Sequence, residues 1–125
     1  MKILLTGGSG YLGSILTRKL LANGHNVRIL DNFLFGKDSL KEIQNNKKLE
    51  LVDGDIRDLS IVGKSLKGID SVIHLASIVG TQSAELDPKA SMEVNFMATR
   101  NIAELCKIYK IKQFIFASTC SVYGA

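Results

Sequence analysis

A glycine-rich turn between an apolar strand and an amphipathic helix is the feature that most constrains this fold. The chain begins Met-Lys-Ile-Leu-Leu-Thr and continues Gly-Gly-Ser-Gly-Tyr-Leu-Gly over residues 7–13. Without side chains at Gly7 and Gly10, backbone N–H groups approach a diphosphate, and Gly13 lets the helix lie close to its strand. The exposed N–H groups and the positive dipole end of the helix then bind the anion. The turn predicts a dinucleotide phosphate site, and its spacing fits a motif counted from either Gly7 or Gly8.

Strands and helices alternate along the whole chain. Strands are predicted at 2–6, 27–30, 49–52, 71–75 and 113–117, with helices from Leu12 to a stop at Asn23-Gly24, near 39–44, over 58–67, and from Pro88 onward. The longest helix has one apolar stripe, made of Val94, Met97, Ala98, Ile102, Leu105 and Cys106. Parallel strands joined by helices predict an α/β doubly wound parallel sheet, a Rossmann fold of five strands in the order 3-2-1-4-5.

Composition excludes several classes of protein. The net charge is +4, but the lysines are scattered among acids, which argues against a nucleic-acid partner. No stretch approaches the ~20 apolar residues that span a bilayer, and the N-terminus lacks a cleavable signal, so we expect no membrane association and a cytoplasmic location. The two cysteines, Cys106 and Cys120, suggest neither a metal site nor a disulfide and are interpreted as buried thiols.

Polar residues at the carboxyl ends of strands are candidate ligand contacts, because ligands bind there in such sheets. Asp31 ends the second strand 18 positions after Gly13 (31 − 13), close to the ~20 expected for a carboxylate on an adenosine ribose. This carboxylate repels a 2′-phosphate and so favours NAD over NADP, and Arg28 lies inside the strand, where it does not rescue phosphate binding. After the third strand, Asp55 and Ile56 fit either an adenine contact or a helix-capping acidic turn.

The later strands end in further candidates. His74 lies in an apolar strand and is interpreted as a satisfied core histidine rather than a catalytic residue or a metal ligand. The small residues over 75–77 let the backbone pass beneath a cofactor ribose and nicotinamide. Asn95 either faces water or bonds inward to a loop or cofactor. The hydroxyls of Ser118 and Thr119 either hold a substrate oxygen or simply end the strand.

Several segments together resemble one family. They are Thr6–Gly13, Leu30–Asn32, Gly54–Arg57, Val72–Ala76, Asp87-Pro88, Val94-Asn95 and Ser118–Gly124. In this order they resemble the N-terminal part of the extended short-chain dehydrogenase/reductase family of NAD-dependent epimerases and dehydratases, and its UDP-glucose 4-epimerases most of all. The resemblance implies an NAD-binding domain over 1–125, a nucleotide-sugar substrate, and hydride transfer to and from NAD.

The resemblance also implies roles for individual residues. Cofactor contacts are implied for Gly7, Gly10, Tyr11, Leu12 and Gly13 at the diphosphate, Asp31 and Asn32 at the ribose, Asp55 and Ile56 at the adenine, Leu75, Ala76 and Ser77 at the nicotinamide half, and Asn95 and Ser118 beside it. Thr119 matches the Ser/Thr that bonds the sugar oxygen undergoing oxidation, and no metal is implied.

Departures from the family pattern limit what the chain does. Cys120 and Ser121 replace the Asp-Glu pair of dehydrating members, which disfavours dehydratase activity, and Val79 replaces an epimerase lysine. None of the three tyrosines is followed four residues later by the lysine of a Tyr-x-x-x-Lys pair, so we expect an N-terminal fragment that is inactive by itself. A reductase of the same family and a non-catalytic dinucleotide-binding module are the alternatives.

The last predicted strand lies at the edge of the sheet. Because unpaired strand edges and uncovered parallel sheets favour association, we expect the chain to form homo-oligomers or to be only marginally stable.

Overall fold

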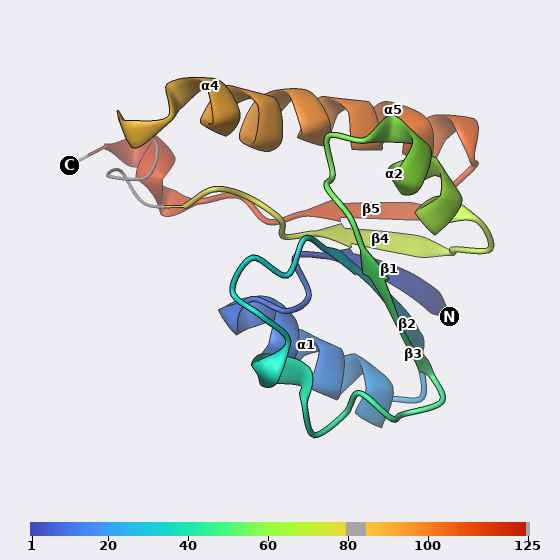
Figure 1. The fold of residues 1–125 in the computed structure, drawn as a ribbon. Helices are drawn as coiled ribbons and strands as arrows, with labels where there is room; N and C mark the ends of the chain where they lie inside the picture. Colours follow the sequence, from blue (N-terminus) through green and yellow to red (C-terminus); the bar gives the residue numbers. More distant parts are fainter. Residues whose placement is uncertain (80–84, 125) are drawn as a thin grey trace.

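The computed structural model describes residues 1–79 and 85–124, with the backbone alone for residues 120 and 121. Its centre is a parallel five-stranded sheet in the order β3-β2-β1-β4-β5, which confirms the predicted order (Figure 1). The strands are β1 (Lys2–Thr6), β2 (Asn26–Asp31), β3 (Leu49–Asp53), β4 (Ser71–His74) and β5 (Gln113–Phe116). Each predicted strand therefore forms, with bounds that differ from prediction by one residue or less.

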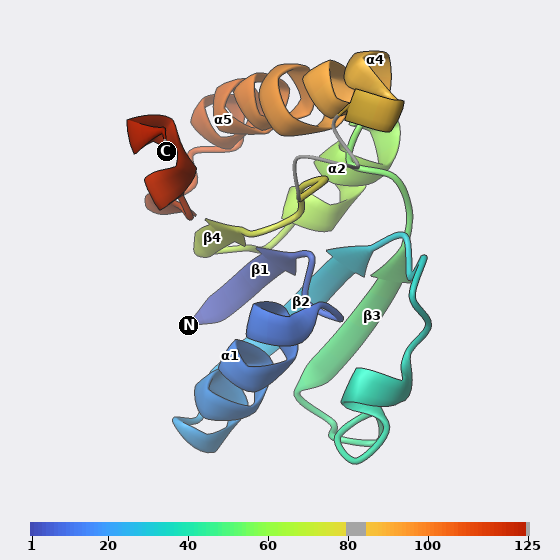
Figure 2. The same cartoon turned by 90° about the vertical axis from the view of Figure 1, so that its left-hand side faces the viewer.

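Helices cover both faces of the sheet. They are α1 (Tyr11–Ala22), the 3₁₀ turn η1 (Asp38–Leu40), α2 (Leu59–Leu66), α4 (Pro88–Ser91), the π-helical segment η2 (Met92–Ala98), α5 (Thr99–Ile108) and the 3₁₀ turn η3 (Cys120–Tyr123). Figure 2 shows α1 on one side of the sheet and α2 with α5 on the other. Within the described ranges, no helix is both long and apolar enough to cross a bilayer.

Alternation along the strands builds a core on each face. Leu4, Leu30 and Val72 pack with the helices α2 and α5, whereas Leu5 and Ile29, from the intervening positions, pack on the face that α1 covers. Successive side chains of a strand point to opposite faces, and both faces are buried here, so the strands read as continuous apolar runs.

Helices α1 and α2 are capped at the boundaries that the sequence predicts. Gly24 has φ +85°, and the N–H groups of Gly24 and His25 donate to the carbonyls of Leu21 and Leu20 at 3.0 and 3.1 Å, which closes α1 with a Schellman motif. Asp58 caps α2 through bonds from the N–H groups of the next turn. These contacts confirm the predicted stop of the first helix and the predicted start of the next long one.

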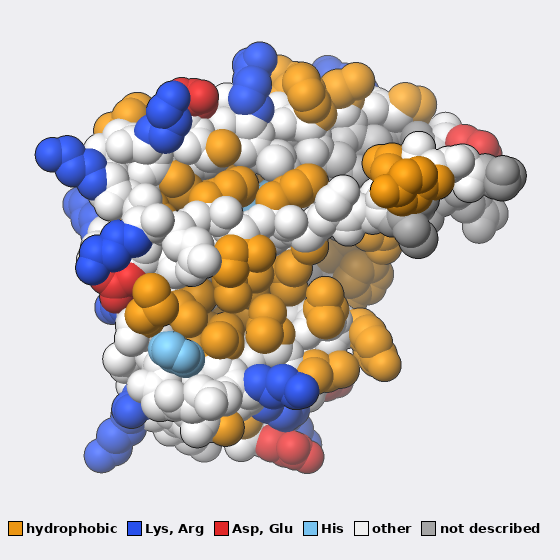
Figure 3. Space-filling model, turned by 180° about the vertical axis from the view of Figure 1, so that it is seen from behind, with side chains coloured by type: hydrophobic (Ala, Val, Ile, Leu, Met, Phe, Trp, Pro, Cys, Tyr) orange, Lys and Arg blue, Asp and Glu red, His pale blue; other side chains and the backbone are white. Residues whose placement is uncertain are grey.

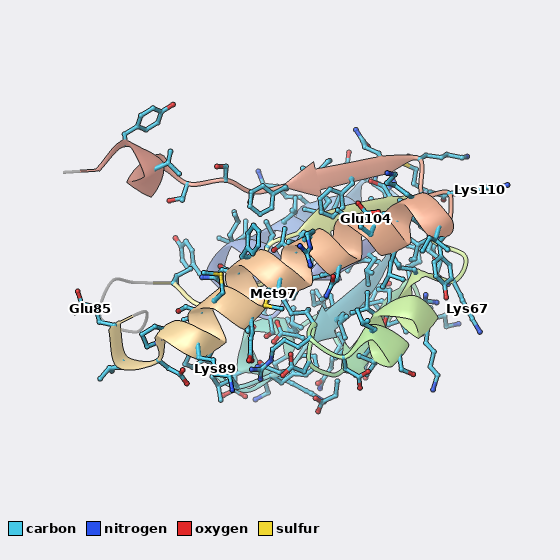
Figure 4. All side chains as sticks on the ribbon, turned by 90° about the horizontal axis from the view of Figure 1, so that it is seen from above. Lys67, Glu85, Lys89, Met97, Glu104 and Lys110 are labelled. Carbon is cyan, nitrogen blue, oxygen red and sulfur yellow. The ribbon has the colours of Figure 1, made fainter. Side chains whose placement is uncertain are left out.

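Two predicted helical segments differ in the structure. The helix expected near 39–44 is a single 3₁₀ turn followed by further turns, with only Leu40 buried. The long helix passes through seven residues of π-helix, and Met97, expected in its apolar stripe, is 42% exposed and lies near the middle of this helix in Figure 4. Val94, in the same segment, still packs against the core, so the predicted stripe fails at Met97, where the wider π turn departs from an α-helical count.

One face of the molecule leaves apolar side chains uncovered. Figure 3 shows hydrophobic side chains gathered across it, and Ile15 on α1, with Ile115 and Phe116 on β5, are exposed. Strand β5 pairs with β4 alone and is an edge of the sheet. Self-association through this edge stays a prediction.

A buried arginine ties β2 to the end of α2. The Nη1 of Arg28 donates to the carbonyls of Ser65 and Lys67 at 2.7 and 2.8 Å, and its Nε lies 2.8 Å from Glu50. Carbonyls at a helix C-terminus carry partial negative charge, which makes this a stabilising place for a cation. Arg28 thus serves the fold, in keeping with its predicted lack of a phosphate-binding role.

We expect Arg28→Met to lower the free energy of unfolding by about 3 kcal/mol, because it leaves two carbonyls and a carboxylate without their donor. Urea unfolding measures this loss. Glu50→Gln is the control: it removes the charge of a half-exposed partner but keeps both carbonyl bonds, so we expect a loss of about 1 kcal/mol or less. Equal losses in the two variants would contradict this role for the carbonyl bonds.

Candidate functional site

The glycine-rich turn leaves β1 at the carboxyl edge of the sheet and comes very close to the chain after β4. Gly7 has φ +72°, and a Cβ built on it would lie 2.8 Å from the backbone nitrogen of Ala76. The Gly7 N–H donates to the Leu30 carbonyl at 3.0 Å, and the Gly10 N–H donates to the Gly7 carbonyl at 3.2 Å. Only glycine meets both the conformation and the space at position 7.

The start of α1 also depends on a glycine. A Cβ on Gly13 would overlap the carbonyl oxygen of Gly7, so the first turn of the helix packs directly on the glycine-rich turn. Gly10 is the N-cap, no side chain caps the helix, and its first turn has no acidic residue. By contrast, Asp58 and Asp87 cap α2 and α4. An uncapped helix start beside a side-chain-free turn fits the diphosphate of a dinucleotide.

Asp31 lies against this turn, as its spacing from Gly13 predicts. Its Oδ2 accepts from the N–H and the hydroxyl of Ser9 at 3.0 and 2.7 Å, and its Oδ1 accepts from the Phe33 N–H at 2.9 Å. A carboxylate offers about four acceptor positions, so the hydroxyls of a bound ribose and the Ser9 side chain draw on the same oxygens. Three of these positions are used within the chain, so two ribose hydroxyls bind only where the Ser9 hydroxyl gives up its bond, and the ribose contact stays a prediction.

A second layer holds Ser9. The Ser39 hydroxyl donates to the Ser9 carbonyl at 2.6 Å, and an Arg18 nitrogen donates to the Ser39 carbonyl at 2.8 Å. The turn η1 is therefore connected to the glycine-rich turn. Sequence reasoning missed all three: the only signal of Ser9 was an unassigned hydroxyl in the glycine motif, and Arg18 and Ser39 lie outside that motif.

Other predicted adenosine and diphosphate contacts lie at the same edge. Tyr11 and Leu12 are exposed at the start of α1, and Asn32 is exposed directly after β2. The Asn32 carbonyl oxygen Oδ1 accepts from the Leu34 N–H at 3.0 Å, which holds the loop in a tight turn. These positions agree with the predicted contacts, which stay predictions.

Asp55 is held by an arginine that the sequence reading did not single out. Arg57 Nη2 and Nε donate to Asp55 Oδ2 at 2.7 and 3.0 Å, and Arg57 Nη1 donates to Glu93 at 3.1 Å. These bonds hold the pKa of the Asp55 carboxyl below its ordinary value. The arginine therefore joins the loop after β3 to the π segment. Ile56 is only 6% exposed and packs in the core, so its side chain offers little surface to an adenine ring.

The end of β4 is joined to β1 by one hydroxyl. Thr6 and His74 are register partners, and Thr6 Oγ1 lies 2.6 Å from His74 Nδ1. The same oxygen accepts from the N–H groups of Leu75 and Ala76 at 3.1 and 3.2 Å. Ser77 follows and is exposed. The predicted nicotinamide segment thus begins at a fixed point beside the glycine-rich turn.

Asn95 bonds inward to a loop, one of the two alternatives that the sequence left open. Its Oδ1 accepts from the Ile78 N–H at 2.7 Å, and its Nδ2 donates to the Ile78 carbonyl at 2.8 Å. The π segment η2 therefore holds the chain after β4 through both backbone groups of one residue.

His74 is a core histidine, as predicted. It is 1% exposed, its Nε2 lies 2.8 Å from Thr99 Oγ1, and its ring stacks near Phe114 and Phe116. Burial lowers the pKa of His74 to about 4, so the ring is neutral near neutral pH. The roles of Thr6 and Thr99 were missed; Thr6 ends an apolar strand, whereas Thr99 is followed by two polar residues and carries no local signal.

The remaining candidates follow the edge strand β5 or lie in the helix α5. Ser118 and Thr119 are exposed in the segment after β5. Cys106 is a buried free thiol whose pKa burial raises to about 11, whereas the side chain of Cys120 lies outside the described residues. Among residues 1–79 and 85–124, the structure has no group of three or more acidic, histidine or cysteine side chains that could hold a metal ion.

The sequence of this chain is similar to those of known nucleotide-sugar enzymes. The sequence model of the NAD dependent epimerase/dehydratase family matches residues 3–125. The chain is 33% identical over 129 residues to UDP-glucose 4-epimerase of Klebsiella pneumoniae, covering 99% of this chain and 93% of that protein. It is 37% identical over 123 residues to UDP-N-acetyl-alpha-D-glucosaminuronate decarboxylase of Bacillus cytotoxicus, covering 98% of this chain and 38% of that protein.

A solved structure is similar as well. The UDP-glucose 4-epimerase of Thermus thermophilus in complex with NAD has a TM-score of 0.84 and 32% identity, covering 95% of this chain and 38% of that chain. The chain spans about two fifths of the length of the first curated relatives that it matches. The cofactor predicted from Asp31 and the glycine-rich turn, NAD, is the cofactor of this family.

A comparison of Gly7→Ala with Gly24→Ala separates two reasons for glycine at position 7: its positive φ and its close approach to the backbone of Ala76. Both residues have positive φ, but a Cβ on Gly24 meets nothing within 4 Å, whereas one on Gly7 meets the Ala76 backbone. We expect Gly24→Ala to cost about 1 kcal/mol of unfolding free energy and Gly7→Ala about 3 kcal/mol, since overpacking adds to the strain. Chemical denaturation measures both losses, and similar values would show that close approach to β4 is unimportant.

Stability should also fall at acid pH because of His74. Its pKa is lowered from 6.5 to about 4 in the folded chain, so between these pH values the unfolded chain binds a proton that the folded chain does not. The free energy of unfolding therefore falls as pH drops through this window, by up to about 3 kcal/mol below pH 4. Urea unfolding at several pH values measures the slope. His74→Phe should flatten it, whereas His25→Gln, which removes the other histidine, should not.

Proposed function

Because this chain belongs to the NAD dependent epimerase/dehydratase family, we propose that residues 1–125 form the NAD-binding domain of a nucleotide-sugar epimerase of the UDP-glucose 4-epimerase type. The observation that carries the proposal is the Asp31 carboxylate held on the glycine-rich turn beside an uncapped α1. An acid at this position suits the two hydroxyls of an NAD ribose and opposes the phosphate of NADP.

Different residues of the chain bind different parts of NAD. The N–H groups at the start of α1 hold the diphosphate, which lies against Gly7 and Gly10 because these residues have no side chain, and Asp31 and Asn32 hold the adenosine ribose. Asp55 accepts from the adenine amino group, and residues 75–77 run under the nicotinamide half. NAD, when bound, supplies the hydride acceptor and donor of the reaction.

Sugar chemistry is assigned to the segment after β5. The Thr119 hydroxyl bonds the sugar oxygen that is oxidised and so fixes its position. Cys120 and Ser121 follow it in the sequence, and neither supplies the acid and base that eliminating water requires, which favours an epimerase over a dehydratase. A reductase of the same family uses the same binding residues and is the nearest alternative.

A second candidate, a non-catalytic dinucleotide-binding module, is favoured by one sequence observation. Tyr11 is followed four residues later by Ile15 and Tyr109 by Gln113, so neither tyrosine has the lysine that lowers a catalytic tyrosine's pKa. We therefore propose that these 125 residues alone turn over no sugar nucleotide. A Tyr-x-x-x-Lys pair about two dozen residues further along the gene would support the enzyme, and an in-frame stop would support the module.

Titration calorimetry with NAD and with NADP tests the proposed function. We expect the native chain to prefer NAD, and Asp31→Ala to weaken NAD binding about tenfold or more, because it removes two hydrogen bonds to a charged acceptor. The same variant should narrow the preference for NAD over NADP, since the repulsion of a 2′-phosphate is lost.

Ser9→Ala is the matched control for a loosened turn. It removes the 2.7 Å hydroxyl bond to Asp31 but keeps the carboxylate, so the preference for NAD over NADP should stay as in the native chain. If Ser9→Ala and Asp31→Ala change this preference equally, Asp31 acts on the turn and not on the ribose. A native chain that binds neither dinucleotide contradicts the proposal.

A further inference from the structure

A chain of hydrogen bonds, buried at Thr6 and His74 and exposed at Asn95, passes through His74 and joins the end of β1 to the π segment η2. On one side, His74 Nδ1 lies 2.6 Å from Thr6 Oγ1, which also accepts from the N–H groups of Leu75 and Ala76. On the other side, His74 Nε2 lies 2.8 Å from Thr99 Oγ1. The proposed function gives this ring no role.

The direction of the bond to Thr6 follows from counting lone pairs. A threonine hydroxyl has one proton to donate and two lone pairs that accept. The N–H groups of Leu75 and Ala76, which can only donate, both donate to this oxygen, and Leu75 shares its proton with the Thr6 carbonyl oxygen at 3.2 Å. The Thr6 hydroxyl keeps its own proton to donate, and His74 Nδ1 accepts it as an unprotonated ring nitrogen.

The bond to Thr99 gives the same answer independently. The Thr99 hydroxyl donates to the Asn95 carbonyl at 2.9 Å, and a carbonyl has no proton to return. Thr99 must then accept from His74, so Nε2 carries the proton. Both sides of the ring specify the neutral Nε2–H tautomer, and an imidazolium would face the Thr6 oxygen with a third donor.

The surroundings of the ring keep it in this state. The groups that contact it are Thr6 on β1, Thr99 on α5, and Phe114 and Phe116 on β5, all of which are uncharged. The far end of the chain is Asn95, whose side chain clamps both backbone groups of Ile78. Hence the segment from Leu75 to Ile78 is anchored at one end by Thr6, which contacts the imidazole, and at the other by Asn95, which is connected to the imidazole through Thr99.

We propose that His74 is a positioning residue that fixes the backbone path of residues 75–78 by joining the Thr6 anchor at one end to the Asn95 clamp at the other. Its use for holding the nicotinamide half of NAD rests on the proposed function. The role itself belongs to the free protein, because every bond that carries it lies within the chain.

The first test reads the ring directly. Correlation spectra of the ¹⁵N-labelled native chain at neutral pH should show Nε2 protonated and Nδ1 unprotonated. An Nδ1–H tautomer or a charged ring would overturn the proposal, and this result needs no variant to fold.

The second test removes the hydrogen bonds between His74 and Asn95 and measures the effect at Ile78. Thr99→Val removes the hydroxyl between His74 and Asn95, whereas Thr99→Ser keeps it. We expect the Ile78 amide to exchange with solvent about tenfold faster in Thr99→Val, as loss of one hydrogen bond that stabilises this segment would give, and at the native rate in Thr99→Ser. NAD binding should weaken in the valine variant alone.

The outcomes separate this role from the proposed function. Native exchange at Ile78 in a folded Thr99→Val chain would overturn the positioning role, whatever the affinity for NAD. A native chain that binds no NAD, but shows the expected tautomer and exchange rates, would contradict the proposed function and support the positioning role.

Discussion

The close approach of two backbone segments at the carboxyl edge of the sheet is the constraint on which the rest of this structure depends. The turn at Gly7 presses against the backbone of Ala76, and the Thr6 hydroxyl satisfies the two N–H groups that leave β4 there. A buried N–H without a partner is costly, so the hydroxyl allows β4 to end directly beside the glycine-rich turn. The candidate site is built on this junction.

Around the junction, the same residues that stabilise the fold also shape the site. Gly13 brings α1 onto the turn and leaves its start uncapped, so the helix presents N–H groups where a diphosphate is expected. Asp31, at the end of β2, holds that turn by accepting two hydrogen bonds from Ser9. On the other side, the π segment η2 carries Asn95 to the chain after β4 and Glu93 to Arg57. The wide helical turn thus serves both neighbouring loops, as π-helical segments at functional sites often do.

Local sequence patterns predicted much of this. The strand order, the glycine-rich turn, the cap at Gly24 and the position of Asp31 follow from periodicity, spacing and the demands of particular residues. Predictions that depended on the details of helical twist did worse. Met97 was assigned to the core because an α-helical count puts it there, and the π segment turns it towards solvent. The adenine contact predicted for Ile56, whose side chain packs in the core, stays a prediction.

The sequence by itself determined which backbone shapes are allowed, because glycine at positions 7 and 13 and alternating apolar strands permit few alternatives. Only the tertiary structure decided which polar groups meet. Thr6, His74 and Thr99 come from β1, β4 and α5, and nothing in their local sequence states that one hydroxyl faces the next. Hydrogen bonds between distant segments depend on how the sheet and helices pack, and that packing also determines where each proton lies.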